Sequence, residues 1–222
     1  MSRRIGIMGG MFDPVHRGHL QVAETALRAL QLEHVRLVPC AVPNHRHPAA
    51  ASAAHRLAML ELALADLGEP GLLADDREFH RPGVSYMVDT LASLAAQFPD
   101  ATLVYILGWD SFNTLPQWHR WQAMLDYCHI CAVSRPGVRL AAGTMRRQDA
   151  DWLLKRQVDS VTSLFTTHSG KLLVLDELSE PAASTDIRQA LSAGQQQIAD
   201  IPDVVLDYIR QHQLYTTPHD NA

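Results

Sequence analysis

Two histidines that flank an arginine and a glycine are the residues best suited to chemistry on phosphate groups. The run His16-Arg17-Gly18-His19 opens a predicted helix and follows a turn at Gly9-Gly10. Free backbone N–H groups and the macrodipole at a helix start favour anions, and Gly18 has no Cβ to obstruct a phosphate. The two imidazoles can point the same way and donate to phosphate oxygens as transition-state charge develops. A metal-binding pair and two unrelated surface histidines are the alternative interpretations.

Other candidate residues follow the other predicted strands. Ligands of an open α/β sheet bind beyond the carboxyl ends of its strands. Glycines, small hydroxyls, histidine and arginine gather in four such segments: Asn44-His45-Arg46, Gly108-Trp109-Asp110-Ser111, Ser134-Arg135-Pro136-Gly137 and Ser184-Thr185-Asp186-Ile187-Arg188. We therefore predict one nucleotide site assembled from several strand ends.

The motif G-G-x-F-D-P-x-H-x-G-H, from Gly9 to His19, resembles the signature of the H-x-G-H nucleotidyltransferase superfamily. Nearly the whole chain resembles one branch, the bacterial nicotinate-nucleotide adenylyltransferases. Further matches are His45-Arg46, Ser85-Tyr86, Gly108-x-Asp110-Ser111 with Trp118, Arg135-Pro136-Gly137, Thr185-x-Ile187-Arg188 and the ending from Ile201 to Tyr215. The sequence departs from the family pattern at Ala183, where a hydroxyl is usual, and at Asn44, where a second proline is frequent.

The resemblance implies transfer of AMP from ATP to nicotinate mononucleotide, which gives deamido-NAD and pyrophosphate. The acceptor phosphate is already anionic and needs no general base, so catalysis would rest on positioning and charge neutralisation. The implied catalytic residues are His16, His19, Arg46 and Arg188. The implied ATP-binding residues are Gly9, Gly10, Phe12, His16, Gly18, His19, Gly108, Asp110, Ser111, Thr185 and Arg188. The implied acceptor-binding residues are Asp13, His45, Arg46, Ser85, Tyr86, Trp118 and Arg135.

Mg²⁺ is expected as the cofactor, bound mainly to the ATP phosphates and not to a metal site of the protein, because this ion keeps several waters. Two other functions stay open. One is a different H-x-G-H transferase, acting on nicotinamide mononucleotide or phosphopantetheine. The other is a nucleotide sensor without turnover, against which the intact His16, His19 and Arg188 argue, because a pure binder gains nothing from groups aimed at transition-state charge.

The elements that must position these residues alternate along the chain. We predict strands near residues 3–8, 34–40, 72–79, 102–107, 127–133 and 172–175, and helices near 18–31, 52–67 and 85–98, the last capped by Ser85. This order predicts a doubly wound, mostly parallel, Rossmann-like α/β sheet with helices on both faces. Residues 139–169 form a polar insertion in this pattern. Two helices follow within about 185–215, separated by Gly194 and Pro202.

Three further features of the sequence receive structural interpretations. Cys128 and Cys131 have C-x-x-C spacing, but residues three apart in a strand face opposite sides, so we expect no redox or metal site there. Trp109 and Trp121 are expected in the core. Trp118 is expected either in the core or stacked on a pyridine ring, because a cationic ring is attracted to an indole face.

Composition sets the general class of the protein. The chain has 222 residues, 47% hydrophobic and 19% charged, which suits a single folded domain spanning 1–222. Its net charge of −5 argues against nucleic acid or an anionic membrane as partner. Three cysteines give no disulfide framework, and no apolar run fits a signal peptide or a membrane span. We expect a cytoplasmic protein, as a monomer or small homo-oligomer, with ATP and nicotinate mononucleotide as its ligands.

Overall fold

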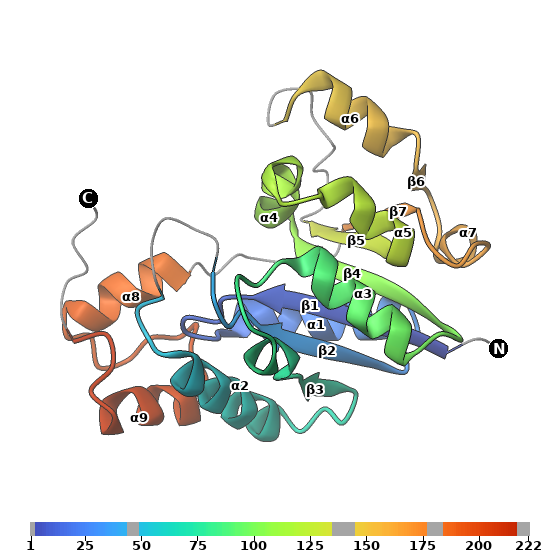
Figure 1. The fold of residues 1–222 in the computed structure, drawn as a ribbon. Coiled ribbons are helices and arrows are strands. Elements are labelled where there is room, and N and C mark those ends of the chain that lie inside the picture. The colour runs from blue at the N-terminus through green and yellow to red at the C-terminus, as the bar shows by residue number, and fades with distance from the viewer. Residues whose placement is uncertain (1–2, 44–48, 135–144, 177–183, 217–222) are drawn as a thin grey trace.

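A seven-stranded parallel sheet forms the centre of the computed structural model, which describes residues 3–43, 49–134, 145–176 and 184–216 (Figure 1). The strands lie in the order β3-β2-β1-β4-β5-β7-β6, and every neighbouring pair is parallel. Their bounds are β1 Arg3–Gly10, β2 His34–Pro39, β3 Leu72–Ala74, β4 Ala101–Gly108, β5 His129–Ser134, β6 Gln157–Val158 and β7 Leu172–Asp176. The doubly wound α/β fold is thereby confirmed.

Helices cover both faces of this sheet, because β1, β4 and β5 carry apolar side chains on both sides. One face packs against α1 (Arg17–Ala29), α2 (Ala53–Leu67), α7 (Val161–Leu164), α8 (Ser184–Ser192) and α9 (Asp203–Gln211). The other face packs against α3 (Met87–Gln97), α4 (Trp109–Thr114), α5 (Met124–Tyr127) and α6 (Arg147–Leu154). Short 3₁₀ helices lie at Arg77–His80, Leu115–Gln117 and Trp121–Ala123.

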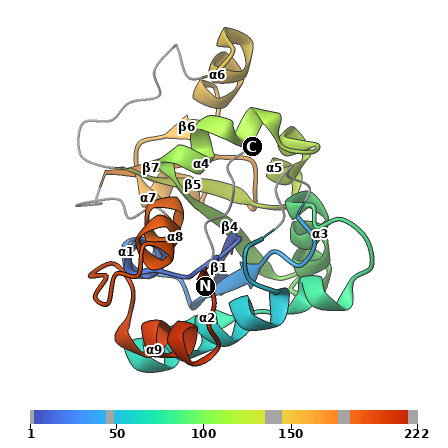
Figure 2. The same ribbon diagram turned by 90° about the vertical axis from the view of Figure 1, so that its left-hand side faces the viewer.

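The chain reverses its direction of travel across the sheet at the β1–β4 pair. Strands β2 and β3 extend the sheet on one side of β1, and β4 starts the extension on the other side. The two C-terminal helices return to the first half of the fold, where α9 lies beside α2 (Figure 2). The last described residues therefore reach the carboxyl edge of the sheet near the end of β1.

Two elements differ from the predicted ones. The segment 139–169 contains β6, which pairs with β7 and makes this region part of the sheet, not only an insertion. The third strand ends at Ala74, and a 3₁₀ turn occupies Arg77–His80, where a strand was predicted. A two-residue strand gives no alternation to detect, and the short β3 is followed by the charged run Asp75-Asp76-Arg77.

The cap predicted for α3 is also wrong. The N-cap residue is Tyr86, which makes no side-chain capping bond. The Ser85 hydroxyl instead accepts the N–H of Val42 at 3.2 Å, while the Ser85 N–H donates to the Val42 carbonyl at 2.8 Å. Ser85 thus joins the start of α3 to the loop after β2 and leaves the first turn of the helix uncapped.

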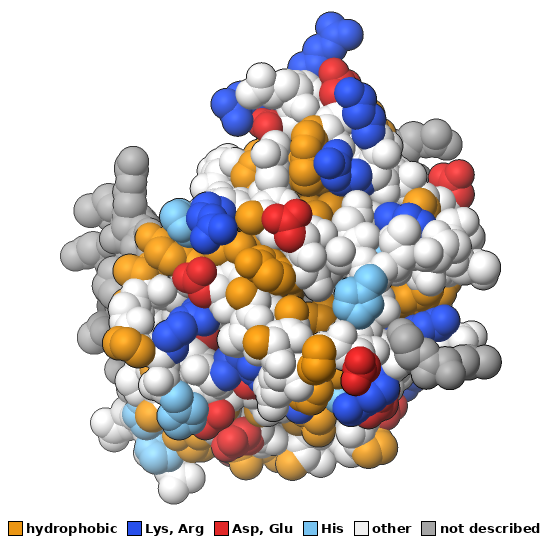
Figure 3. All heavy atoms as spheres, turned by 45° about the vertical axis from the view of Figure 1, so that its right-hand side comes forward, with side chains coloured by type: hydrophobic (Ala, Val, Ile, Leu, Met, Phe, Trp, Pro, Cys, Tyr) orange, Lys and Arg blue, Asp and Glu red, His pale blue; other side chains and the backbone are white. Residues whose placement is uncertain are grey.

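Surface charge is mixed on the face in Figure 3, apart from Lys and Arg side chains that gather at the projecting end formed by α6. Arg146 and Arg147 lie at the start of α6 and are both exposed. Among the helices of the described ranges, none is long and apolar enough to cross a membrane.

Candidate functional site

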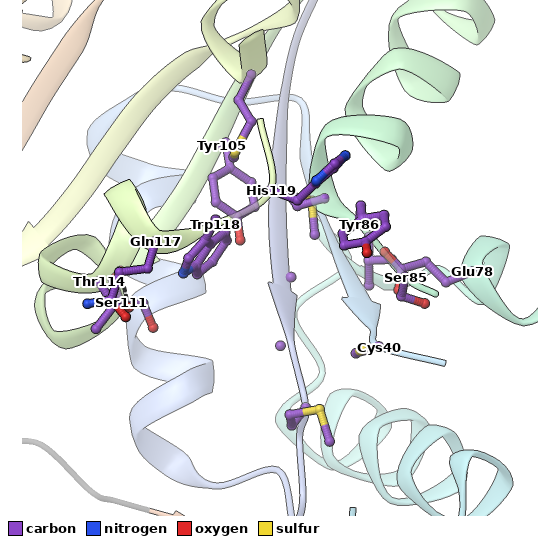
Figure 4. Close-up of a pocket in the computed structure, with 16 residues that line it drawn as sticks. Cys40, Glu78, Ser85, Tyr86, Tyr105, Ser111, Thr114, Gln117, Trp118 and His119 are labelled. Carbon is purple, nitrogen blue, oxygen red and sulfur yellow. Dashed lines mark hydrogen bonds between the residues drawn. The ribbon is translucent and has the colours of Figure 1, made fainter. Parts of the chain in front are cut away.

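A cavity of about 620 Å³ opens at the carboxyl edge of the sheet, where the strand order reverses (Figure 4). Gly9 and Gly10 line it from the end of β1, and Tyr105 lines it from β4. A Cβ at Gly9 would lie 2.2 Å from Cε of Met87 and 3.2 Å from the Tyr105 hydroxyl oxygen. Glycine at this position therefore lets the backbone of β1 lie against the side chains of Met87 and Tyr105 at the base of the cavity.

The segment from Gly9 to His19 is called the glycine-turn motif. Its two histidines form a stacked pair at the start of α1. Their ring centroids are 3.6 Å apart, and the His16 backbone N–H donates to Nδ1 of His19 at 3.3 Å. Because Nδ1 of His19 accepts this bond, the ring proton lies on Nε2, which is then a donor. The Phe12 ring packs edge-on against His19 at 5.0 Å and holds its orientation. The two ring planes are nearly parallel, with 24° between them. Donation by both rings to phosphate stays a prediction.

Burial keeps both imidazoles neutral. It lowers the pKa of His16 to about 4, against a small opposing effect of Asp200. Burial also lowers the pKa of His19 well below its ordinary value, and the neighbouring His16 lowers it further. Nδ1 of His16 is buried and has no hydrogen-bond partner among the described residues. Such an atom is costly unless a ligand or water satisfies it, so the pair fits a site that receives polar groups.

Arg188 is brought to this motif by α8, across 175 positions of sequence. Its Nη1 donates to the backbone carbonyl of Asp13 at 2.8 Å, and its Nη2 donates to the Thr185 hydroxyl at 3.3 Å. The Ser184 hydroxyl donates to the Pro14 carbonyl at 3.4 Å. The structure therefore brings α8 to the glycine-turn motif, as predicted.

Asp13 was predicted to contact the acceptor, and the structure gives its side chain a different role. The carboxylate is 4% exposed and accepts the N–H groups of Ala50 and Ala51 at 2.7 and 3.0 Å. The Tyr215 hydroxyl donates to the same carboxylate at 2.7 Å. With three donors on a buried carboxylate, most of its acceptor sites are used, so this side chain is an internal anchor.

Aromatic side chains form the far wall of the cavity (Figure 4). Trp118 lies edge-to-face with Tyr105, with 6.1 Å between ring centroids, and Tyr86 packs against His119 at 4.1 Å. Polar groups of Ser85, Ser111, Thr114 and Gln117 are interspersed among them. A cavity lined by aromatic rings and several polar groups suits a planar ring that carries polar substituents. Trp121 is buried and Trp109 packs partly buried against the core, as predicted.

Several residues of the wall were not singled out from the sequence. Glu78 lines the cavity although it is only 2% exposed, and its carboxylate accepts the Thr90 hydroxyl at 2.6 Å. The Arg81 guanidinium donates to Thr90 Oγ1 at 3.1 Å and to the Tyr86 carbonyl at 3.4 Å. Tyr105 carried a usable signal, as the one aromatic residue within the aliphatic run of β4.

The other predicted residues divide into two groups. Gly108 is the N-cap of α4 and Asp110 lies in its first turn, and of the predicted segment only Ser111 lines the cavity. His45, Arg46, Arg135 and Ala183 lie outside the described residues.

Within the described part of the chain, no three His, Cys, Asp or Glu side chains are close enough together to hold a metal ion. Cys128 and Cys131 are both buried and pack in opposite clusters of the core, as their spacing predicted.

Comparison with known proteins places these features in a family. Residues 7–190 match the sequence model described as Cytidylyltransferase-like. A probable nicotinate-nucleotide adenylyltransferase of Aeromonas salmonicida (strain A449) is 41% identical over 211 residues, covering 95% of this chain and 96% of its own. A second protein of that description, from Pseudomonas aeruginosa (strain UCBPP-PA14), is 40% identical over 220 residues, covering 99% and 100%.

Solved structures agree with the fold. The nicotinic acid mononucleotide adenylyltransferase of Plasmodium falciparum, complexed with NaAD, superposes with a TM-score of 0.72 over 97% of this chain and 98% of its own. Its sequence identity is 17%, so this likeness concerns the fold alone. The same enzyme complexed with APC gives a TM-score of 0.70 at 18% identity, with the same coverage.

Proposed function

This chain belongs to the cytidylyltransferase-like family, among its nicotinate-nucleotide adenylyltransferases, and we propose that it transfers the adenylyl group of ATP to nicotinate mononucleotide in NAD biosynthesis. The observation that carries the proposal is the stacked pair His16 and His19 at the start of α1, on the same chain segment as Gly9 and Gly10, which line a cavity walled by Trp118 and Tyr86. One part of the site suits a phosphate chain, and the other suits a planar ring.

The reaction exchanges one phosphate bond for another. An oxygen of the acceptor phosphate forms a bond to the α-phosphorus of ATP, and the bond from that phosphorus to the bridging oxygen of pyrophosphate breaks. The attacking oxygen is already anionic, so no protein base has to remove a proton. The task of the protein is to align two highly charged reactants and to neutralise charge as it shifts to the leaving group.

We assign this task to donors around the glycine turn. His19 would donate from Nε2 to an oxygen of the transferred phosphate, and His16 would act beside it. Both are neutral donors, which avoids the cost of burying two stacked cations. Arg188 would hold the outer phosphates, and its two bonds to the protein already orient its guanidinium. Arg46 on a reacting phosphate remains a prediction, as do Gly108 and Asp110 as partners of the adenosine.

The acceptor ring would lie between the aromatic side chains of the cavity. Ser85, Tyr86 and Met87 line this space at the start of α3. The leading amides of any helix have no acceptors within that helix. Backbone donors of this kind suit a carboxylate. Trp118 would supply a stacking surface for the pyridine.

Magnesium would arrive with ATP. It would bind the triphosphate oxygens and water, and its charge would neutralise phosphate charge during transfer. The remaining parts of the proposal are a cytoplasmic location and action as a monomer or small homo-oligomer, with no nucleic acid or membrane as partner.

Pyrophosphate release measured with ATP and each acceptor in turn tests the proposal. Purified protein receives ATP and Mg²⁺ with nicotinate mononucleotide, nicotinamide mononucleotide or phosphopantetheine, and the dinucleotide product is identified by mass. We expect rapid release only with nicotinate mononucleotide. Release with none of them would favour the sensor, and release with another acceptor would move the chain to that transferase.

A further inference from the structure

The segment after α9 is linked to the glycine-turn motif through a buried hydrogen bond. Tyr215 lies beyond α9, yet its hydroxyl donates to Asp13 Oδ1 at 2.7 Å across 202 positions of sequence. Both partners are buried, at 7% and 4% exposure. A neutral donor on a buried carboxylate makes a strong bond whose loss leaves the acceptor unsatisfied.

The protonation state of Tyr215 keeps it a donor. Burial raises its pKa, and the adjacent Asp13 carboxylate raises it further, so the phenol stays protonated at working pH. Its backbone also has a φ of +60°, a left-handed conformation that is unusual for an aromatic residue. A residue held in such a conformation by its surroundings has its place determined by tertiary contacts.

The same aspartate serves Arg188 through its backbone. Nη1 of Arg188 donates to the Asp13 carbonyl at 2.8 Å. Asp13 therefore receives the C-terminal phenol on its side chain and the arginine of α8 on its main chain. Any shift of Asp13 moves the acceptor to which Arg188 is fixed.

We propose that Tyr215 is a positioning residue for nucleotide binding, acting through Asp13 on Arg188. The phenol sets the Asp13 backbone, and the Asp13 carbonyl sets the guanidinium that meets the outer phosphates of ATP. This inference rests on the proposed function for the identity of the nucleotide. The competing role for Tyr215 is a purely structural one, in which it only fastens the C-terminal segment to the core.

Tyr215→Phe removes the hydroxyl and keeps the ring, and Tyr208→Phe is its matched control. The Tyr208 hydroxyl lies 2.9 Å from Nδ1 of His55, a contact between α9 and α2 that does not involve Asp13. We expect Tyr215→Phe to raise the Michaelis constant and the dissociation constant for ATP about tenfold, with less than a twofold change for the acceptor. The control should leave all of these within twofold. A purely structural role would change both substrates alike or neither, and either result would overturn the proposal.

A double-variant cycle with Arg188 separates positioning from stability. If Tyr215 acts through the guanidinium, Tyr215→Phe should have little further effect on ATP affinity in an Arg188→Ala background. An undiminished tenfold loss in that background would refute the route through Arg188. Circular dichroism and thermal unfolding of each variant show that the comparison concerns folded protein. Should Tyr215→Phe fail to fold, Asp13→Glu replaces it, because this variant keeps the charge and moves the carboxylate. It should also weaken ATP binding while leaving the acceptor within twofold.

Calorimetric titration with a non-hydrolysable ATP analogue, without acceptor, keeps this test apart from the proposed reaction. Weaker analogue binding in Tyr215→Phe supports the positioning role even if the wild type uses another acceptor. Unchanged analogue binding overturns it even if the wild type makes deamido-NAD.

Discussion

His16 and His19 stack with 3.6 Å between ring centroids and 24° between ring planes, which makes it unfavourable for both to be charged. A third imidazole, His129, lies in the core, where its ring accepts the Lys171 N–H at 3.1 Å and donates to the Thr167 carbonyl at 3.1 Å. Burial lowers the pKa of His16 and of His129 to about 4. The fold therefore contains histidines whose neutral form it requires.

Stability should consequently fall as pH drops from about 6.5 to 4. In this window the unfolded chain protonates these histidines and the folded chain does not, so acid favours unfolding. For one histidine whose pKa is 6.5 in the unfolded chain and about 4 in the folded chain, the free energy of unfolding falls by about 3 kcal/mol between these two pH values. Urea unfolding at pH 7.5, 6.0 and 5.0 measures this. His129→Gln should flatten the slope, whereas His80→Gln, at an exposed site, should not; a slope equal in all three proteins would contradict the assignment.

Substitutions of His19 should lower turnover more than ATP affinity. His19→Ala removes a donor aimed at transition-state charge, a change that costs about 100-fold in kcat. Glutamine can place an amide N–H near the position of Nε2, whereas asparagine is too short, so His19→Gln should retain more activity than His19→Asn. Steady-state kinetics of the three variants give the order. Equal kcat in wild type and His19→Ala would remove this histidine from the mechanism.

Arg188→Ala should raise the Michaelis constant for ATP as well as lower kcat, because a guanidinium on the outer phosphates acts in the ground state and the transition state alike. Lysine keeps the charge but loses the forked bonds to Asp13 and Thr185, so Arg188→Lys should restore activity only in part. Initial rates over a range of ATP concentrations measure both constants. Values within twofold of wild type for Arg188→Ala would place the triphosphate elsewhere.

The sequence predicted those parts of the site that are local. Gly9, His16 and His19 lie within one strand, turn and helix, so their spacing carries their geometry. Arg188 follows the predicted strand at 172–175, so the rule that ligand groups lie beyond the strand ends predicted its approach to the turn after β1. Its contact with phosphate stays a prediction. The role of Asp13 was not predictable, because its partner Tyr215 is fixed by the docking of α9 and not by any local pattern.

The buried face of α2 shows a second limit. Leu57, Leu60 and Leu64 have helical spacing, and Leu60 and Leu64 are buried, but Leu57 is only half-buried. Arg56 occupies the fully buried position instead, at 1% exposure. An arginine on a helix indicates a solvent-exposed face by pattern alone, and only the tertiary structure shows the carbonyl groups that it serves.

Replacing Arg56 should destabilise the fold strongly. Its guanidinium donates to three backbone carbonyls from separate segments, those of Ala51, Met11 and Cys40, at 3.3, 2.8 and 2.6 Å. Arg56→Met would leave these buried acceptors unpaired, at a cost of about 3 kcal/mol or more. Arg28→Met, at a side chain that is 68% exposed, should cost under about 1 kcal/mol. Urea denaturation compares the two, and similar midpoints would show that Arg56 does not join these segments.

The choice of acceptor should depend on the start of α3 and not on the indole. Nicotinate and nicotinamide mononucleotides differ only in a carboxylate against a carboxamide, so backbone donors in the first turn of α3 would be satisfied by the first and opposed by the NH₂ of the second. Such a mismatch can discriminate by about 10⁴. Trp118 would stack on either ring, so Trp118→Ala should weaken both acceptors alike and preserve the preference. The specificity constants of both acceptors on wild type and Trp118→Ala test this. Loss of the preference in Trp118→Ala would move selection to the indole, because uniform stacking alone cannot distinguish two rings of the same shape.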